Sequence, residues 1–291
     1  MTCLEARGLR KAYGPKVALD GIDLRLEEGR ILGLIGPNGA GKSTALQAIT
    51  GLIPYDGALK VLGRDPWKDR GALMNDVCFI ADVAVLPRWM RVRQAIDFMA
   101  GVHPWFDRER AEAFLARTNI ATTDKVRQLS KGMVTQLHLA LVMAVDARLL
   151  VLDEPTLGLD LLYRKQFYKA LLNDYFDGNR TIVVSTHDVS EVEHILTDVV
   201  FVNRGRVVFE SSMEDVEARF AEVVVPPEQM SAARALQPIQ ERQAFGRNIL
   251  LFDNRDRARL SALGEVRNAS LAEVFVALLS RDAAPSRRTA A

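Results

Sequence analysis

Residues Ile31 to Thr44 read ILGLIGPNGAGKST, and this stretch decides the fold. Its first five residues form an apolar run that is typical of a buried parallel strand. The next six, GPNGAG, contain three glycines, too many for the interior of a helix or strand. A helix then opens at Lys42 and is expected to stop at Gly51. Strand, glycine-rich loop and helix follow one another as a phosphate-binding loop requires, and an ordinary glycine-rich turn is the alternative.

The chemistry of phosphate binding explains this spacing. Successive backbone N–H groups must converge on one anion, so side chains have to be absent from the loop, and the next helix directs its positive end at the same phosphates. Lys42 is long enough to reach the β- and γ-phosphates, and the Ser43 hydroxyl is a ligand for Mg²⁺. The expected phosphate-contacting residues are Gly36, Pro37, Asn38, Gly39, Ala40, Gly41, Lys42, Ser43 and Thr44.

The composition is that of an ordinary globular protein. The chain has 291 residues, 48% of them hydrophobic and 26% charged, and a formal net charge of +1, which gives no argument for nucleic acid as a bulk partner. Cys3 and Cys78 are the only cysteines, so neither a disulfide framework nor a zinc site is expected. There is no run of about 18 apolar residues and no apolar leader, so we expect a protein that does not itself span a membrane.

Hydrophobic periodicity predicts two domains. Residues 1–212 alternate strands and helices around an all-helical insert at about 88–146, which favours a parallel sheet with helices on both faces. Residues 213–291 change character and are expected to form a small accessory domain. Strands are predicted over residues 2–9, 17–26, 57–63, 77–80, 149–152, 181–184, 199–202, 207–210 and 249–252. Helices are predicted over 92–101, from the candidate N-cap Asp107 onward, and over 130–145, 161–176, 189–196 and 270–279, the last capped by Ser270.

Two carboxylates end the apolar strand Leu149–Leu152. Asp153 and Glu154 lie at the carboxyl end of a predicted parallel strand, where ligands bind in such sheets. Asp153 is suited to hold Mg²⁺ opposite Ser43 through a bound water. Glu154 is suited to act as a general base on the attacking water. A solvated strand end is the alternative.

Weaker candidates surround this pair. Ser130 and Gly132, in LSKGM, open a predicted helix whose start is an anion site, although Ser-capped helices are common. His187, in STHD, follows the next strand, where a lone histidine is more often structural. Asp160, in LGLD, is expected to line the same region. Tyr13 lies in a predicted turn and is either a ring that stacks on a purine or a plain turn residue.

In the order GPNGAGKS, LSKGM, LLVLDEP, LGLD and STHD, these motifs resemble the ATP-binding subunit of ABC transporters over residues 2 to about 210. The resemblance implies an α/β fold of the P-loop NTPase class, with a RecA-like parallel core, N-terminal antiparallel strands, a helical insert and an α+β C-terminal domain. It implies that Asp153 and Ser43 hold Mg²⁺, that Glu154 is the catalytic base, that His187 is the switch histidine and that Tyr13 stacks on adenine. It also implies that Ser130 and Gly132 bind the γ-phosphate held by an opposite subunit.

Two parts of the sequence depart from the family pattern, the LSKGM motif at two positions and the segment at Asp82. Lys131 stands where a second glycine is usual, and Met133 stands where glutamine is usual. Asp82 stands where the family commonly has a glutamine that touches Mg²⁺ and relays to the membrane partner. A carboxylate at Asp82 is still able to accept a metal-bound water, so we retain it as a metal candidate.

The resemblance therefore predicts an ATP-hydrolysing subunit that binds ATP and Mg²⁺ and drives a separate transmembrane permease. The LSKGM form and the C-terminal SLAEVFVALL are similar to the exporter-type branch. A homodimer or paralogous heterodimer on the cytoplasmic face of the inner membrane is implied, and no nucleic acid partner is expected. The alternatives are a soluble ATPase of the same family that acts on nucleic acid or the ribosome, and a regulatory subunit with weak hydrolysis.

Overall fold

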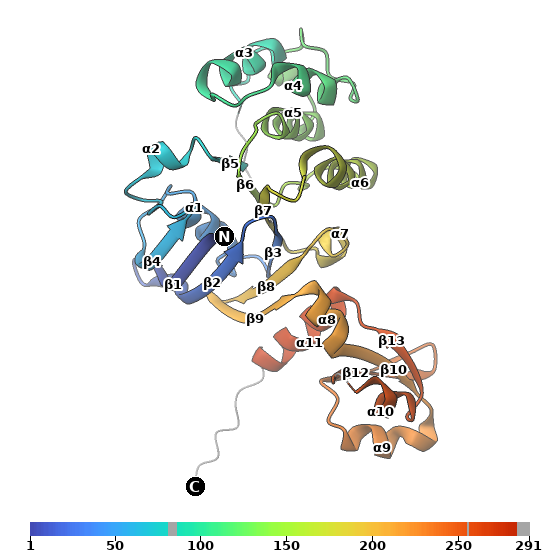
Figure 1. The fold of residues 1–291 in the computed structure, drawn as a ribbon. Helices are drawn as coiled ribbons and strands as arrows, with labels where there is room; N and C mark the ends of the chain where they lie inside the picture. Colours follow the sequence, from blue (N-terminus) through green and yellow to red (C-terminus); the bar gives the residue numbers. More distant parts are fainter. Residues whose placement is uncertain (81–85, 255, 284–291) are drawn as a thin grey trace. The chain divides into compact units, whose positions relative to one another are not determined.

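The computed structural model describes residues 1–80, 86–254 and 256–283 (Figure 1). The chain divides into two compact units. The first comprises Met1–Leu196 and Val202–Val207, and the second comprises Thr197–Phe201 and Val208–Ala291. Each unit is described by itself below.

The chain contains a six-stranded sheet of order β5-β6-β7-β3-β8-β9, of which β5, β6, β7 and β3 lie wholly within the first unit and form its centre. Its strands are β5 Val77–Ile80, β6 Leu149–Asp153, β7 Thr181–Thr186, β3 Ile31–Ile35, β8 Asp198–Asn203 and β9 Arg206–Ser212. The pairs β5–β6, β6–β7 and β7–β3 are parallel. Every residue of β3, β6 and β7 is buried, as expected for largely apolar strands in a parallel sheet covered on both sides. The predicted parallel α/β core is confirmed.

The N-terminal strands form a separate antiparallel sheet of order β2-β1-β4. Its strands are β1 Thr2–Tyr13, β2 Lys16–Glu27 and β4 Asp56–Val61. The first two strands are longer than predicted, and Tyr13 is the last residue of β1, paired with Lys16, and not part of the turn. The turn itself is Gly14 and Pro15, where Gly14 supplies the positive φ of 57°.

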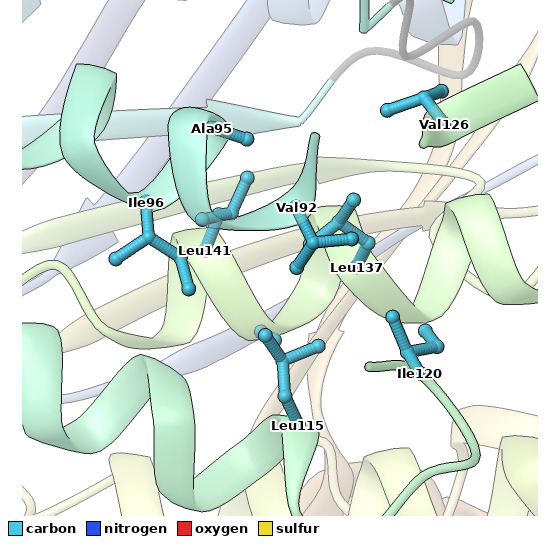
Figure 2. Close-up of a cluster of buried hydrophobic side chains, with 9 residues drawn as sticks. Val92, Ala95, Ile96, Leu115, Ile120, Val126, Leu137 and Leu141 are labelled. Carbon is cyan, nitrogen blue, oxygen red and sulfur yellow. The ribbon is translucent and has the colours of Figure 1, made fainter. Parts of the chain in front are cut away.

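The helical insert is confirmed as three helices with a core of their own (Figure 2). The helices are α3 Val92–Val102, α4 Arg108–Leu115 and α5 Lys131–Met143, with a 3₁₀ turn at Val126–Gln128 before α5. Asp107 and Ser130 cap α4 and α5 by accepting hydrogen bonds from Arg110 N and Met133 N, as predicted. The shared core consists of Val92, Ala95, Ile96, Leu115, Ile120, Val126, Leu137, Ala140 and Leu141.

Each of the other helices of the first unit lies between two strands in the sequence. They are α1 Lys42–Ile49, α2 Arg70–Leu73, α6 Leu161–Ala170 with a π-helical turn at Leu171–Tyr175, and α7 Val189–Val192. The helix predicted over residues 189–196 is wrong in its second half, because α7 ends at Val192. Leu196 there packs its side chain into the space left by Gly33, where an added Cβ would lie 2.5 Å from Leu196 Cδ1.

The second unit is an α+β fold around a four-stranded antiparallel sheet of order β11-β12-β10-β13. Its strands are β10 Phe220–Val225, β11 Gln240–Ala244, β12 Arg247–Asp253 and β13 Glu265–Asn268. Its helices are α8 Met213–Arg219, α9 Met230–Ala235 after a 3₁₀ turn at Pro227–Gln229, α10 Arg257–Ser261 and α11 Leu271–Ala283. Its core lies on one face of β10 and contains Ala221, Val223, Val225, Leu250 and Phe252. Ser270 accepts a hydrogen bond from Glu273 N at the start of α11, as predicted.

Within the described residues, none of the helices is long and apolar enough to cross a membrane.

Candidate functional site

The glycine-rich loop connects β3 to α1 and is held close to neighbouring backbone. A Cβ added to Gly36 would lie 2.3 Å from Val202 O, and one added to Gly41 would lie 2.5 Å from Ala18 O. Gly39 has a φ of 80° and no atom within 4 Å of an added Cβ, so open space lies beside it. The loop is therefore packed on one side by backbone carbonyls and open on the other, as an anion cradle made of main-chain amides needs.

Lys42, the first residue of α1, extends its side chain back along this loop. Its Nζ donates to Gly36 O at 2.7 Å and to Pro37 O at 3.4 Å. The same Nζ lies 3.2 Å from Glu154 Oε1, and the side chain is only 6% exposed. The sequence predicted a lysine beside phosphate, and the structure also places it beside the proposed catalytic carboxylate.

Glu154 follows β6 in the sequence, and its side chain lies between Lys42 and His187. Its Oε2 lies 2.9 Å from His187 Nδ1, while Oε1 faces Lys42. Its backbone N–H donates to Ser185 O at 3.2 Å and to Ser185 Oγ at 3.1 Å. This backbone has a φ of 47°, which is uncommon for a residue with a side chain. Lys42, Glu154 and His187, the three predicted catalytic residues, thus meet at the carboxyl ends of β6 and β7 and the start of α1.

Ser185 is a functional residue that the sequence did not identify. Ser185 lies on β7, which pairs with β6, and it is in register with Asp153. Its Oγ donates to Asp153 Oδ1 at 2.5 Å. The same Oγ accepts the Glu154 N–H, so one hydroxyl fixes both acidic residues. Asp153 is buried, and this hydrogen bond from a neutral hydroxyl orients its carboxylate. Only the register of β6 against β7 would have identified Ser185 in advance.

The open side of the loop faces a surface hollow. The residues that line it are Tyr13, Lys16, Ala18, Asn38, Gly39, Ala40, Gly41, Lys42, Ser43, Thr44 and Glu154. Tyr13 is 47% exposed at the end of β1, and Lys11 Nζ lies 5.3 Å from the centre of its ring. The hollow is thus bounded by an aromatic ring on one side and by the loop, the α1 N-terminus and a carboxylate on the other.

Three predicted contact residues lie elsewhere. Ser130 caps α5 and Asp160 caps α6, accepting from Tyr163 N at 3.1 Å, and neither lines the hollow. Gly132 lies beside Gly158, whose carbonyl oxygen would be 3.5 Å from an added Cβ. The Lys131 side chain also packs on Gly158, with Cε 3.2 Å from an added Cβ there. Ser130, Gly132 and Asp160 therefore form a second group, around the LGLD segment.

The donors near the loop fit Mg²⁺ better than a transition metal. In the described parts of the chain, no three His, Cys, Asp or Glu side chains are close enough to form a metal cluster. Mg²⁺ needs no such cluster, because it usually takes one or two protein oxygens together with phosphate and water. Ser43 Oγ and the Asp153 carboxylate are oxygen donors of that kind. Asp82, the third predicted metal residue, lies outside the described residues.

Several known proteins are similar to this chain. A family model described as ABC transporter matches residues 19–157. The daunorubicin resistance ATP-binding protein DrrA3 of Streptomyces coeruleorubidus is 32% identical over 249 residues, which cover 82% of this chain and 78% of that protein. The Nod factor export ATP-binding protein I of Cupriavidus metallidurans is 31% identical over 305 residues, which cover 96% and 98%. A solved ATP-binding subunit of an ABC transporter shares the fold, with a TM-score of 0.68 at 24% identity over 74% of this chain and 92% of that one.

Proposed function

Because this chain belongs to the ATP-binding proteins of ABC transporters, which hydrolyse ATP to power transport, we propose that its ATPase site is the loop Gly36–Thr44 with Glu154 and His187. The observation that carries the proposal is the convergence of three side chains: Lys42 Nζ lies 3.2 Å from Glu154 Oε1, and His187 Nδ1 lies 2.9 Å from Glu154 Oε2. A cation, a carboxylate and an imidazole beside an anion cradle are the groups that phosphoryl transfer to water uses.

The loop amides and the α1 N-terminus bind the phosphates of ATP, and Tyr13 stacks on the adenine. Lys42 exchanges the carbonyls of Gly36 and Pro37 for phosphate oxygens, which are stronger partners for an ammonium because they are charged. Ser43 and Asp153 hold Mg²⁺. When bound, Mg²⁺ neutralises phosphate charge.

Glu154 takes a proton from the attacking water, and His187 holds the carboxylate in place. The Oε1 atom of Glu154 supports this role, because it is buried, lies beside Lys42 and accepts no hydrogen bond of good geometry from the described residues. Once Lys42 turns to the phosphates, Oε1 is the basic atom available to a water. Ser185 fixes the Glu154 backbone during this step through its bonds to the Glu154 N–H.

Ser130, Gly132 and Asp160 act on a nucleotide held by a second subunit. Their separation from the hollow supports this assignment, because Ser130 and Asp160 cap helices outside it and Gly132 lies beside Gly158 of the LGLD segment. A head-to-tail dimer would bring the Ser130 helix start to the γ-phosphate bound by the partner's loop. The dimer is either a pair of identical chains or a pair with a paralogue.

The transported molecule crosses a permease on a separate chain, to which this subunit attaches at the cytoplasmic face of the cell membrane. Proteins of this family act with a transmembrane permease, and the described part of this chain has no helix that spans a membrane. Export is the favoured direction, because the relative matched over 96% of this chain is named for Nod factor export. Nothing in the comparisons favours a nucleic-acid-acting ATPase.

Glu154→Gln tests the proposal. The amide keeps the shape of the side chain and cannot accept the proton, so ATP binding is expected to persist while hydrolysis falls about a hundredfold or more. The purified protein is assayed for phosphate release and for ATP binding by fluorescence of a nucleotide analogue, with Glu241→Gln in the second unit as the control. An ATP-stabilised dimer in size-exclusion chromatography would support the two-subunit site. Hydrolysis by Glu154→Gln at the wild-type rate would remove Glu154 from its role, and a wild-type protein without ATPase activity would leave the regulatory alternative.

A further inference from the structure

Glu191, on α7, is a nearly buried carboxylate with a defined partner on each oxygen. It lies four residues after His187 and is 13% exposed. Thr156 Oγ1 donates to Glu191 Oε2 at 2.9 Å, and the Arg164 guanidinium pairs with Glu191 Oε1. A carboxylate this far out of water is stable only with such partners. Both partners belong to segments next to the proposed ATPase site.

These bonds close a ring that contains the catalytic carboxylate. Thr156 is two residues after Glu154, and Glu191 is on the helix that follows His187. One side of the ring is the contact of 2.9 Å between His187 Nδ1 and Glu154 Oε2, and the opposite side is the Thr156–Glu191 hydrogen bond. Release of the second bond frees α7 to shift and to carry His187 away from Glu154.

Arg164 extends this ring to the LGLD segment. Its Nε donates to Leu159 O at 2.8 Å while a terminal nitrogen pairs with Glu191. Leu159 is buried immediately before Asp160, the N-cap of α6. The planar guanidinium therefore fixes the LGLD backbone and the α7 carboxylate at one separation, which a lysine with a single ammonium does not do.

A neutral hydroxyl completes the group. Thr156 is buried, and its Oγ1 lies 3.3 Å from the hydroxyl of Tyr168, whose burial raises its pKa. The group thus has one cation and one anion, so its charges balance. A purely structural ion pair would need only Arg164 and Glu191. The additional hydrogen bond from Thr156 links Glu191 to the segment that follows Glu154.

We propose that Glu191 is a positioning residue for ATP hydrolysis, which holds His187 against Glu154 and links their separation to the position of the LGLD segment through Arg164. This inference rests on the proposed ATPase site. It predicts that a displacement of the LGLD segment reaches Glu154 through side chains of the same chain, without any contact to nucleotide.

The test compares variants that differ by one group. Glu191→Gln keeps the side-chain shape and removes the charge that pairs with Arg164. Thr156→Val removes only the hydroxyl, and Thr156→Ser restores it. Glu241→Gln is the matched control, because it removes a similar arginine ion pair, to Arg234, from the second unit.

In steady-state assays, Glu191→Gln and Thr156→Val are expected to lower kcat about tenfold to a hundredfold, because misplacement of a reacting group costs a factor of this size. The KM for ATP is expected to stay within about twofold of the wild-type value. Thr156→Ser and Glu241→Gln are expected to match wild type. Unchanged kcat in Glu191→Gln and Thr156→Val would overturn the proposal, as would a rise in KM that accounts for the whole loss.

A second readout does not depend on hydrolysis. The protein, labelled with ¹³C at its four histidines, gives a ring signal for His187 that is assigned by its loss in His187→Gln. Glu191→Gln and Thr156→Val are expected to move this signal toward its position in Glu154→Gln. A His187 signal that moves in Glu154→Gln and stays in place in both other variants would overturn the positioning role. A wild-type protein that shows these shifts but hydrolyses no ATP would instead contradict the proposed function.

Discussion

The ammonium of Lys42 lies 3.2 Å from Glu154 Oε1, and the two side chains are 6% and 12% exposed. A nearly buried ion pair therefore joins the start of α1 to the end of β6. The pair is costly to desolvate, and removal of one partner leaves the other charge without compensation. Phosphate and water are the groups that would compete for Lys42 and Glu154 in the proposed reaction, so this pair connects stability with nucleotide binding.

Lys42→Met is expected to destabilise the protein when no nucleotide is present. Of the side-chain partners that the structure describes for the Glu154 carboxylate, His187 then remains, and the loss costs about 1–3 kcal/mol, which lowers the melting temperature by several degrees. The Lys42→Met/Glu154→Gln double variant is expected to lose less than the sum of the single losses. Lys68→Met, which removes an exposed pair with Asp65, is the control. Additive losses would mean that the Lys42–Glu154 contact contributes nothing.

Ser185→Ala is expected to reduce turnover while ATP binding persists. It removes the donor to Asp153 Oδ1 and one of the two acceptors of the Glu154 N–H, so both acidic residues lose alignment. We expect kcat to fall about tenfold to a hundredfold and the affinity for ATP to change by less than about threefold. Phosphate release and nucleotide titration measure the two effects, and Ser280→Ala on α11 is the control. A loss of ATP affinity as large as the loss of kcat would contradict the prediction.

Gly36→Ala is expected to disrupt the loop although the loop is open on its other side. The new Cβ would meet a backbone carbonyl, Val202 O, at 2.3 Å, and backbone cannot move aside as a flexible side chain does. Loss of ATP binding and a lower melting temperature should follow. Gly101→Ala in α3 meets nothing within 4 Å and is expected to be neutral or to stabilise by up to about 1 kcal/mol. Equal effects of the two substitutions would contradict this account.

The buried His138 on α5 is expected to make stability depend on pH. Burial lowers its pKa from 6.5 to about 4, so between these values the unfolded chain binds a proton that the folded chain does not. This contribution to stability is complete above pH 6.5 and is lost as the pH falls toward 4, by at most about 1.4 kcal/mol per pH unit. Burial lowers the pKa of His103 as well, which adds to the same trend.

Melting temperature measured from pH 7 to pH 4.5 checks this effect. His138→Gln is expected to give a flatter curve than wild type, because the group with the lowered pKa is absent. His194→Gln, which alters an exposed histidine, is expected to keep the wild-type slope. Parallel curves for wild type and His138→Gln would show that His138 does not carry the dependence.

The sequence predicts the parallel core well because its local signals agree. Residues 149–152 are all apolar, and the run ends in two acids, as expected for a buried parallel strand that ends at a ligand site. The glycine-rich loop is equally clear, since Gly36 and Gly41 approach backbone so closely that a side chain is excluded. Helix caps such as Asp107 and Ser130 are local too, and both form the predicted bonds.

The contacts that the sequence missed depend on the register and packing of distant segments. Ser185 meets Asp153 only because β6 and β7 pair in one register, and serine in an apolar strand has no distinctive signal. Leu196, beyond the end of α7 at Val192, packs against Gly33, and helix periodicity does not include such a contact between distant segments. The Lys42–Glu154 pair joins residues that are far apart in the sequence, so their charges alone did not predict it.

The backbone of Glu154 has a φ of 47°, so the residue that the backbone favours and the residue that hydrolysis requires differ at this position. A glycine there would adopt this conformation at no steric cost and relieve about 1 kcal/mol of backbone strain, but it would leave Lys42 without its nearly buried partner. The same replacement would delete the carboxylate. Selection for turnover therefore has to retain a residue that the backbone geometry disfavours, and two hydrogen bonds from its N–H to Ser185 help to make that conformation persist.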